Sequence, residues 1–461
     1  MTQPLEAFTY RDGVLHVGEV PVSEIAEAVG TPTYVYSADA IRSNYRRIER
    51  AFAPLGAHLH YAVKASSNLH LLRLLHDQGA GMDVVSGGEL ERAWLAGTPM
   101  QDIVFAGVGK TEAEQRAALD GRWSPLRDDA DRLGGENIEN RGSVGLFNVE
   151  SSSELEVLAR VAAELGVVAR ACIRVNPDVD ARTHEYTTTG KEENKFGVLA
   201  ARVPELFAAF RDIGSIELVG LHVHIGSPVR EIEPYESAVR VLLRLIDTLE
   251  AAGDAVSVLD LGGGWPMSYT EGESPEIEVF ANALIPLLEA RTQNGLQVVL
   301  EPGRSILANS GVLLTRVQHI KEGRRKRFVI CDAGMHTLIR PAFYRAFHFV
   351  WPAQVETRHV PPSAAERLDL PGLHLSDVVG PVCETGDFLA RGRELPPVKR
   401  GDLIAVFSAG AYGMSMSSNY NDHGRPAEVL VDGKRAVLIN ERQKLAALLE
   451  TEKSPRELNT E

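Results

Sequence analysis

The chain has 461 residues, 44% of them hydrophobic, and a formal charge of −15. This length exceeds one ordinary core, so we expect two globular domains. The acidic residues are dispersed, and the one short basic run, residues 321–327, stands just before a strand-like segment. This pattern argues against nucleic acid as a partner.

The cysteines and the N-terminal residues indicate the cellular compartment in which the protein is expected. Cys172, Cys331 and Cys383 are widely separated and odd in number. They argue against a disulfide framework and a zinc cluster, and they favour a reducing, cytoplasmic location. Residues 1–20 have neither a basic start nor an apolar run. We therefore expect no signal peptide and no membrane span.

Eight strand-like runs, each ending in polar residues or glycine, alternate with amphipathic helical segments. In segments 152–165 and 233–252, for example, apolar residues recur at spacings of three and four. This alternation predicts a parallel sheet covered by helices, and eight repeats predict a (β/α)8 TIM barrel over residues 36–310. The strand-like runs are 58–65, 81–86, 102–107, 146–151, 168–177, 218–227, 256–264 and 297–304.

Both ends of the chain lack the barrel rhythm. Short runs rich in Val, Ile and Phe, at 327–332, 377–383 and 402–408, are separated by Gly and Pro. They predict a second, mostly antiparallel β domain, a sandwich or barrel. Because the two ends look alike, we expect residues 1–35 and 311–450 to form it together, with the barrel inserted between them.

Two segments fit neither domain. Residues 123–142 form a polar, Gly- and Asp-rich insertion, which we interpret as a surface loop. Residues 451–461 are polar and are expected to be a disordered tail.

The active site of such a barrel is built by the C-terminal strand ends and the loops that follow them. The predicted rim can therefore be named before any chemistry is assumed. It comprises Lys64, Asp83, Ser86, Asn176, His224, Ser227, Gly262, Gly263, Gly264, Glu301 and Arg304.

Lys64 ends an apolar strand-like run. A lysine desolvated at a barrel mouth can have a lowered pKa and act as an amine nucleophile that forms a Schiff base. The alternative is a lysine that emerges into solvent, and position alone does not separate the two.

Gly262, Gly263 and Gly264 follow the seventh run. Loops after the seventh and eighth strands commonly bind phosphate, and residues without Cβ let backbone N–H groups approach an anion. Ser227 and Arg304, which end the sixth and eighth runs, favour a phosphate site. The alternative is an ordinary turn.

His222 and His224 alternate on one predicted strand and would share a face. A metal site is one interpretation, but neither cysteine nor a clustered carboxylate is expected nearby, so we predict no metal. The imidazole at the strand end suits stacking on a planar ring better. Core packing without a function is the alternative.

A phosphorylated planar cofactor that accepts a Schiff base is pyridoxal 5'-phosphate, which needs a group that keeps its ring nitrogen protonated. Glu301 is placed for that role at the end of the eighth run. The alternative is a salt bridge to Arg304, three residues further on.

These motifs resemble the fold type III, alanine-racemase-like pyridoxal-phosphate decarboxylases over nearly the whole chain. Within that family they are most similar to members that convert meso-2,6-diaminopimelate to L-lysine and carbon dioxide. The matching motifs are residues 61–65, 83–89, 174–177, 183–186, 195–197, 222–227, 262–264, 301–304, 332–344, 383–387 and 410–421.

For the cofactor, the resemblance implies that Lys64 is the lysine that attaches it, that His224 stacks on its ring and that Glu301 pairs with its pyridine nitrogen. Ser227, the glycine loop and Tyr412 would hold its phosphate. The other expected cofactor contacts are Asp83, Gly303 and Arg304.

For the substrate, the resemblance implies that the carboxylate of the end that does not react is bound by Arg304, Arg340 and Tyr344, with Tyr412 as a further contact. Glu384 would take the distal amino group, and Cys383 would protonate the carbon that loses carbon dioxide. In this family Cys383 and Glu384 reach the partner subunit's active site. The resemblance therefore implies a homodimer with shared sites.

The main alternative is a decarboxylase of ornithine, arginine or carboxynorspermidine on the same fold. The carboxylate that leaves should not itself be held by a cation. Arginines in the site therefore make sense only if the substrate has a second carboxylate, and ornithine and arginine have none. A racemase would not need Cys383 and Glu384, and a non-catalytic regulator should lack Lys64, the glycine loop or Cys383. Pro228 stands where the family usually has glutamine, which puts loop motion in question.

Overall fold

Two compact units make up the computed structural model, which describes residues 3–121, 142–180, 194–450 and 452. The first, here called the barrel unit, contains residues 41–268 and 272–307; the second, the β unit, contains residues from both chain ends and 269–271. The insertion expected at 123–142, apart from Gly142, and the tail expected at 451–461, apart from Glu452, lie outside the described residues.

Eight parallel strands close the barrel unit. Each strand pairs with the next in chain order, and β13 pairs with β5 to complete the circle. The short strand β10 (Val198–Leu199) adds to β9. The predicted TIM barrel is confirmed. The strands are β5 (His58–Ala62), β6 (Gly81–Val84), β7 (Ile103–Phe105), β8 (Leu146–Val149), β9 (Ala169–Asn176), β11 (Ile216–His222), β12 (Val258–Asp260) and β13 (Gln297–Leu300).

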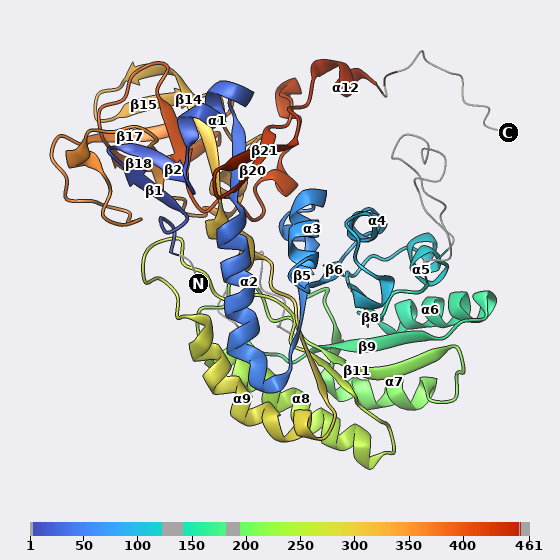
Figure 1. The fold of residues 1–461 in the computed structure, drawn as a ribbon. Coiled ribbons are helices and arrows are strands. Elements are labelled where there is room, and N and C mark those ends of the chain that lie inside the picture. The colour runs from blue at the N-terminus through green and yellow to red at the C-terminus, as the bar shows by residue number, and fades with distance from the viewer. Residues whose placement is uncertain (1–2, 122–141, 181–193, 451, 453–461) are drawn as a thin grey trace. The chain divides into compact units, whose positions relative to one another are not determined.

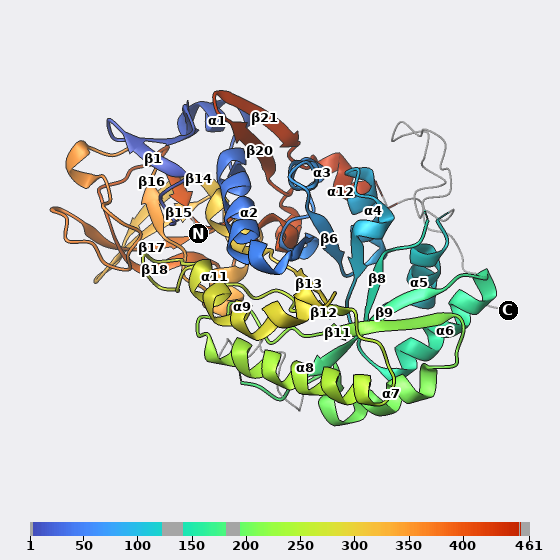
Figure 2. The ribbon, with the colours of Figure 1, turned by 60° about the horizontal axis from the view of Figure 1, so that its bottom comes forward.

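Helices cover the outside of these strands, as Figure 2 shows for α6 to α9. Helix α6 illustrates the local cause: the Ser151 side chain accepts from the Glu154 N–H at its start, and Gly166 ends it in the left-handed region at φ 67°. The helices are α2 (Ala38–Phe52), α3 (Leu69–His76), α4 (Gly87–Leu95), α5 (Glu112–Leu119), α6 (Ser152–Leu165), α7 (Val203–Phe210), α8 (Glu233–Ala251), α9 (Ile277–Gln293) and α10 (Arg304–Leu307).

The barrel has a packed apolar core. Six strands contribute side chains that are at most 7% exposed: Val104, Leu146, Cys172, Val219, Val258 and Val299. Branched residues of this kind fill the interior of such barrels. The polar rim therefore stands on a rigid base.

The β unit is built on one large sheet with the order β18-β17-β15-β14-β4-β20-β21. Figure 1 labels the strands of this sheet except β4. Its central strand β14 pairs with β4, β15 and β19, and β19 also pairs with β16. All of these pairs are antiparallel except β15 with β17 and β4 with β20. The strands are β4 (Thr33–Ser37), β14 (Gly311–Glu322), β15 (Arg327–Cys331), β16 (Val350–Pro352), β17 (His374–Val379), β18 (Phe388–Leu395), β19 (Leu403–Val406), β20 (Ala427–Asp432) and β21 (Arg435–Asn440).

The N-terminal residues contribute to this unit as expected. Strand β4 lies between β14 and β20 in the large sheet. Before it, β1 (Phe8–Arg11), β2 (Val14–Val17) and β3 (Val20–Pro21) form a small antiparallel sheet, followed by α1 (Val22–Val29). The mostly antiparallel β domain is confirmed.

Within the described ranges, the longest and most apolar helices fall short of what a membrane crossing requires.

Candidate active site

Lys64 and Asp83 form an ion pair at two neighbouring strand ends. Lys64 lies in a 3-10 turn directly after β5, and its Nζ is 2.8 Å from Oδ2 of Asp83 on β6. The Asp83 side chain is fully buried, whereas that of Lys64 is 36% exposed. Burial and the Glu301 charge raise the pKa of Asp83, while Lys64 acts in the opposite direction. The lysine is thus held by a partner and still partly open to solvent.

His224 is held as a neutral ring. Its Nδ1 accepts a hydrogen bond from the Gly263 N–H at 3.1 Å, so a neutral ring must carry its proton on Nε2. Burial lowers the pKa of His224 well below 6.5, and the charges of Arg174 and Lys64 lower it further. An uncharged, oriented imidazole follows.

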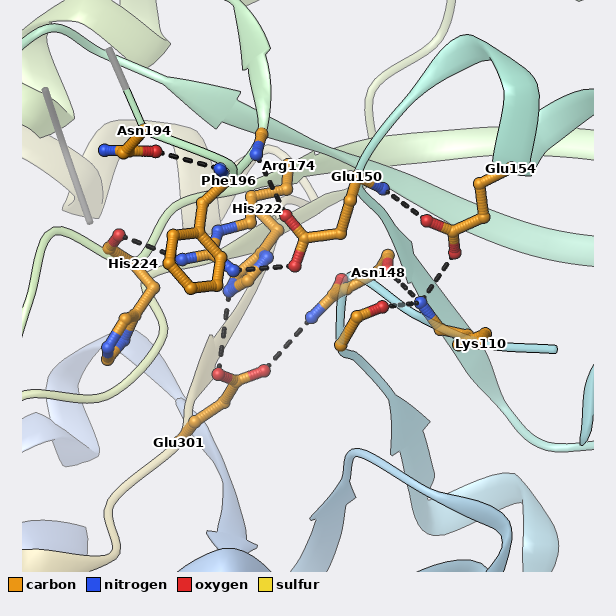
Figure 3. A network of polar contacts seen from close by, with 12 residues as sticks. Lys110, Asn148, Glu150, Glu154, Arg174, Asn194, Phe196, His222, His224 and Glu301 are labelled. Atoms are coloured by element: carbon orange, nitrogen blue, oxygen red, sulfur yellow. Dashed lines mark hydrogen bonds and ion pairs between the residues drawn. The ribbon is translucent and has the colours of Figure 1, made fainter. Parts of the chain in front are cut away.

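The two histidines do not share a strand face. Strand β11 ends at His222, so the prediction that both lie on one strand is wrong. The His222 ring points to Glu301, and its Nε2 is 3.6 Å from Glu301 Oε2 (Figure 3). The argument that no clustered carboxylate lies near His222 is also wrong, because single oxygen or nitrogen atoms of His222, Asp260 and Glu301 lie within 4.8 Å of one another.

The glycine loop needs its glycines. Gly262 has φ 65° and Gly264 has φ 95°, which other residues rarely adopt. A Cβ on Gly263 would lie 2.5 Å from the carbonyl oxygen of Glu301, and one on Gly264 would lie 2.1 Å from that of Gly226. The loop is therefore packed against the ends of the neighbouring strands.

Two aromatic residues that sequence reasoning missed hydrogen-bond the carbonyl groups of this loop. The Tyr235 hydroxyl donates to the Gly263 carbonyl at 2.7 Å, and the Trp265 indole N–H donates to the Gly262 carbonyl at 3.0 Å. Their rings stack with centroids 4.6 Å apart. These bonds turn the loop carbonyls toward the protein interior. The only sequence signal was that Tyr235 and Trp265 are apolar positions next to predicted loops.

The end of the eighth strand meets that of the sixth. Arg304 Nε donates to the Ser227 hydroxyl at 3.2 Å. A Cβ on Gly303 would come within 3.0 Å of the Ala62 side chain and 3.2 Å of that of Ala65, so this strand end also packs closely on the turn that carries Lys64. The structure thus brings Ser227, Gly303 and Arg304 together with the predicted lysine turn.

Glu301 has described partners other than Arg304, the salt-bridge partner that was considered as an alternative. Its Oε1 accepts from the Asn148 side-chain amide at 3.0 Å, and its described ion pair is with His222. Asn148 also donates to Asp260 Oδ2 at 2.9 Å. Asn148 and Asp260 were not predicted as site residues, because Asn148 stands within a strand and Asp260 precedes the glycine loop.

A second buried network holds the backbone of His224 (Figure 3). Arg174 pairs with Glu150 at 2.7 Å and donates to the His224 carbonyl at 3.3 Å. The other Glu150 oxygen accepts from the Gly197 N–H at 2.9 Å. A buried ion pair whose remaining oxygens and protons are satisfied is costly to break. The position of His224 is thereby tied to two strands.

The remaining predicted residues lie in the β unit. Arg340 begins α11 (Arg340–Tyr344) and is 5% exposed, with Nη2 donating to the Tyr269 hydroxyl at 2.8 Å and Nε donating to His348 Nε2 at 3.3 Å. Tyr344 ends α11 and is half-buried. Tyr412 lies in the loop after β19 with φ 56°, in the left-handed region.

Cys383 and Glu384 lie on an exposed loop between β17 and β18. The Tyr420 hydroxyl donates to Glu384. Asp387 anchors the loop, because its two carboxylate oxygens accept from the N–H groups of Met335 and Val382, each at 2.6 Å. The Asp387 anchor was not predicted as a separate feature.

Comparison with known proteins places the chain in a family. Residues 38–308 match the pyridoxal binding domain of the pyridoxal-dependent decarboxylases. A diaminopimelate decarboxylase of Aquifex aeolicus is 43% identical over 96% of this chain and 96% of its own length. One from Pseudomonas aeruginosa is 44% identical over 96% of this chain and 98% of its own length.

A solved structure gives the same relation. The crystal structure of diaminopimelate decarboxylase from M. jannaschii in complex with L-lysine has a TM-score of 0.85 and 33% identity, and the match covers 98% of this chain and 99% of that one. Sequence and fold agree over nearly the full length. The chain therefore belongs to the pyridoxal-dependent decarboxylases, among the members that are named diaminopimelate decarboxylase.

Proposed function

We propose that this chain removes one carboxyl group of meso-2,6-diaminopimelate to form L-lysine and carbon dioxide, the last step of lysine biosynthesis, with pyridoxal 5'-phosphate as cofactor. The observation that carries the proposal is the set of groups that follow three strands of the barrel: the Lys64 amine, the neutral His224 ring and the buried Glu301. The relatives named diaminopimelate decarboxylase support the choice of substrate.

The residues of the barrel unit fit this cofactor. Oδ1 of Asp83 and Oδ1 of Asn148 are buried without a hydrogen-bond partner, as expected at a polar site made for a ligand. When bound, pyridoxal phosphate supplies a conjugated ring that accepts the electron pair left by carbon dioxide. Within the proposal, Lys64 attaches the cofactor and Asp83 orients the lysine.

Other residues would hold and polarise the same group. His224 offers a flat uncharged face, and Glu301 holds a proton at the pyridine nitrogen. The loop of Gly262, Gly263 and Gly264, with Ser227 and Tyr412, would bind the phosphate through N–H and O–H donors. Gly303 and Arg304 complete the proposed cofactor contacts.

The substrate's second carboxylate explains the arginines. A planar guanidinium binds a carboxylate through two parallel hydrogen bonds, and a diamine precursor would leave such a group unpaired. We assign this role to Arg340 and Arg304, with Tyr344 and Tyr412 as further contacts, and we assign the distal amino group to Glu384. The Tyr269 hydroxyl and His348 support the orientation of Arg340.

Cys383 would deliver the proton that replaces carbon dioxide on the substrate. Its exposure on the loop between β17 and β18 is consistent with use at a partner's site. We therefore propose a homodimer with shared active sites. We also propose a cytoplasmic location, and domains at residues 36–310 and at 1–35 with 311–450.

Carbon dioxide release by the chain loaded with pyridoxal phosphate tests the function directly. Meso-diaminopimelate and L-ornithine are assayed in parallel, and the amine product is identified. Release from diaminopimelate with formation of L-lysine is expected. Release from ornithine alone would overturn the role of Arg340 and move the chain to the ornithine, arginine or carboxynorspermidine branch.

A further inference from the structure

Four polar side chains meet at the C-terminal ends of barrel strands: Asn148, His222, Asp260 and Glu301. They come from β8, β11, β12 and the residue after β13. None is more than 3% exposed. Buried polar groups need partners, so their mutual bonds decide where charge can reside.

One amide bridges two carboxyl groups. The Asn148 side-chain nitrogen donates to Asp260 Oδ2 at 2.9 Å and to Glu301 Oε1 at 3.0 Å. The other Asp260 oxygen accepts from the Gly262 N–H at 2.8 Å. Asn148 thus holds the two carboxyls side by side at a fixed spacing.

The arrangement suits a proton better than a metal ion. A bound cation between the two carboxyls would face the positive end of the Asn148 N–H dipoles. Two buried carboxyl groups this close cannot both ionise, so one of them keeps a proton. The surroundings of Asp260 and Glu301 then determine which of the two carboxyls keeps the proton.

Glu301 is the carboxyl with partners that can carry positive charge. Its Oε2 faces His222 Nε2 at 3.6 Å, whereas the described partners of Asp260 are the neutral N–H groups of Asn148 and Gly262. A partner that can take up a positive charge favours an ionised carboxyl more than a donor that always stays neutral. The charge is therefore placed on Glu301.

The surrounding charges point the same way. Burial and the Glu301 charge raise the pKa of Asp260 well above its ordinary value. Burial alone would raise the pKa of Glu301, but His222 and Lys64 outweigh it and hold that pKa far below its usual range. Four other described titratable groups interact with the pair. Lys64 opposes the charge of Asp83, and burial lowers the pKa of His60 to about 4. Burial also lowers the pKa of His224 and raises that of Cys172, which favours the neutral form of both.

We propose that Asp260 is a positioning residue that keeps the single proton shared by the two carboxyls and donates it in a hydrogen bond to Glu301, while Asn148 fixes their spacing. Glu301 can then present a full negative charge to the cofactor's ring nitrogen. This inference rests on the proposed cofactor and goes beyond it, because it makes the charge on Glu301 depend on Asp260, which is not among the proposed cofactor contacts.

The first test needs no variant. Protonated carboxyls absorb at a higher C=O stretching frequency than carboxylates, so infrared spectra of the cofactor-loaded chain at pH 7 can show them. Aspartate labelled with 13C should shift one such band that labelled glutamate leaves in place, and Asp260→Asn should remove that band. If the band that Asp260→Asn removes shifts with labelled glutamate, or if the aspartate band persists in Asp260→Asn, the assignment is overturned. Glu89, whose pKa burial raises to about 7, gives a separate band that is identified by its loss in Glu89→Gln.

The second test measures cofactor affinity. The cofactor-free chain is titrated with pyridoxal phosphate and with an analogue whose ring nitrogen is replaced by carbon. The ratio of the two Kd values reports the contact between Glu301 and the nitrogen. Asp260→Leu should lower the preference for pyridoxal phosphate about tenfold, as expected when a hydrogen bond to a charged group is lost.

Matched variants separate this role from general damage. Asp260→Asn can still donate an N–H to Glu301 and should keep the preference to within about threefold, because only the donor is needed. Asp254→Asn alters another carboxyl, whose side chain is 8% exposed and pairs with Arg211, and should leave the ratio unchanged. An unchanged ratio in Asp260→Leu would overturn the proposal.

The two possible failures look different. If the proposed function is wrong, the unaltered chain will fail to bind pyridoxal phosphate or to release carbon dioxide from diaminopimelate. If only the role of Asp260 is wrong, the unaltered chain will do both, and Asp260→Leu will match it in the affinity ratio.

Discussion

The barrel unit and the β unit present their candidate groups in opposite ways. In the barrel unit, Asp83 and Glu301 are buried and already paired with Lys64 and His222. In the β unit, Cys383 and Glu384 stand exposed on a loop. The comparison shows that buried partners within the barrel unit fix the charges of its candidate groups, whereas Cys383 and Glu384 lie largely in solvent.

The physical reason is the cost of burying charge. A buried carboxylate must be paired and hydrogen-bonded, so its neighbours fix its protonation before any ligand arrives. An exposed cysteine or glutamate carries no such cost and needs no such partner. Arg340 is the exception in the β unit, because it is buried and is oriented by Tyr269 and His348.

The largest expected effect is that of Lys64→Ala. Removing the amine that we propose attaches the cofactor should lower kcat by at least about 10³-fold, as for other covalent groups. Loss of the cofactor adduct trapped by borohydride provides the measurement. Lys434→Ala, at an exposed lysine, serves as the control. A trapped adduct on a lysine other than Lys64 would contradict the assignment.

Cys383→Ala should lower kcat about 10²-fold, because general acids typically contribute at least that much. Cys331→Ala, at a buried cysteine, is the matched control. Mixing inactive Lys64→Ala chains with Cys383→Ala chains should restore about a quarter of wild-type activity, since half of the twofold-symmetric dimers are hybrids and each hybrid has one intact site. No recovery after proven subunit exchange would argue that each chain uses its own cysteine.

Arg340→Lys tests the buried cation of the β unit. Losing the proposed pair of hydrogen bonds to the distal carboxylate should reduce kcat/KM for diaminopimelate about 10- to 100-fold, with KM rising more than kcat falls. Arg316→Lys, at an arginine that donates to the Gly401 carbonyl, is the control. An effect on kcat alone would place Arg340 at the reacting end of the substrate.

The smallest expected effect concerns pH and stability. Burial raises the pKa of Glu89 to about 7, against the hydrogen bond that it accepts from the Val85 N–H. Because the folded pKa exceeds the unfolded value, this group stabilises the fold below about pH 4.5, and the contribution is lost as pH rises to about 7.

Glu89→Gln should remove that dependence. Thermal unfolding of the cofactor-free chain should show the wild type losing on the order of 2–3 kcal/mol relative to Glu89→Gln between pH 4.5 and pH 8. Asp254→Asn, at a carboxylate paired with Arg211, controls for general charge effects. Parallel curves for wild type and Glu89→Gln would contradict the raised pKa.

Much of the fold follows from local pattern. All eight strands begin at or within two residues of their predicted runs, because alternating apolar periods and terminal glycines are local features of the chain. The strands end earlier than predicted, since residues such as Lys64 and His224 leave the sheet to build the rim. Helix α6 matches its prediction at both ends, where Ser151 and Gly166 give explicit signals.

Local sequence patterns could not predict hydrogen-bond partners that are far apart along the chain. Asn148 and Asp260 are 112 residues apart, yet one hydrogen bond joins them. Tyr269 reaches Arg340 from 71 residues away. Nothing in the residues around Asn148 or Tyr269 marks these contacts, since strand order and side-chain direction arise only when the barrel closes and the sheets form.

The sequence by itself determined the two fold classes, the rim of the barrel and the identity of most proposed site residues, because periodicity, glycines and motifs are encoded locally. Only the tertiary structure decided which groups share protons and charge. The state of Glu301 depends on His222, Asn148 and Asp260, which three other strands deliver to one buried point. Electrostatic energies depend on distance and burial in space, and neither can be obtained from separation along the chain.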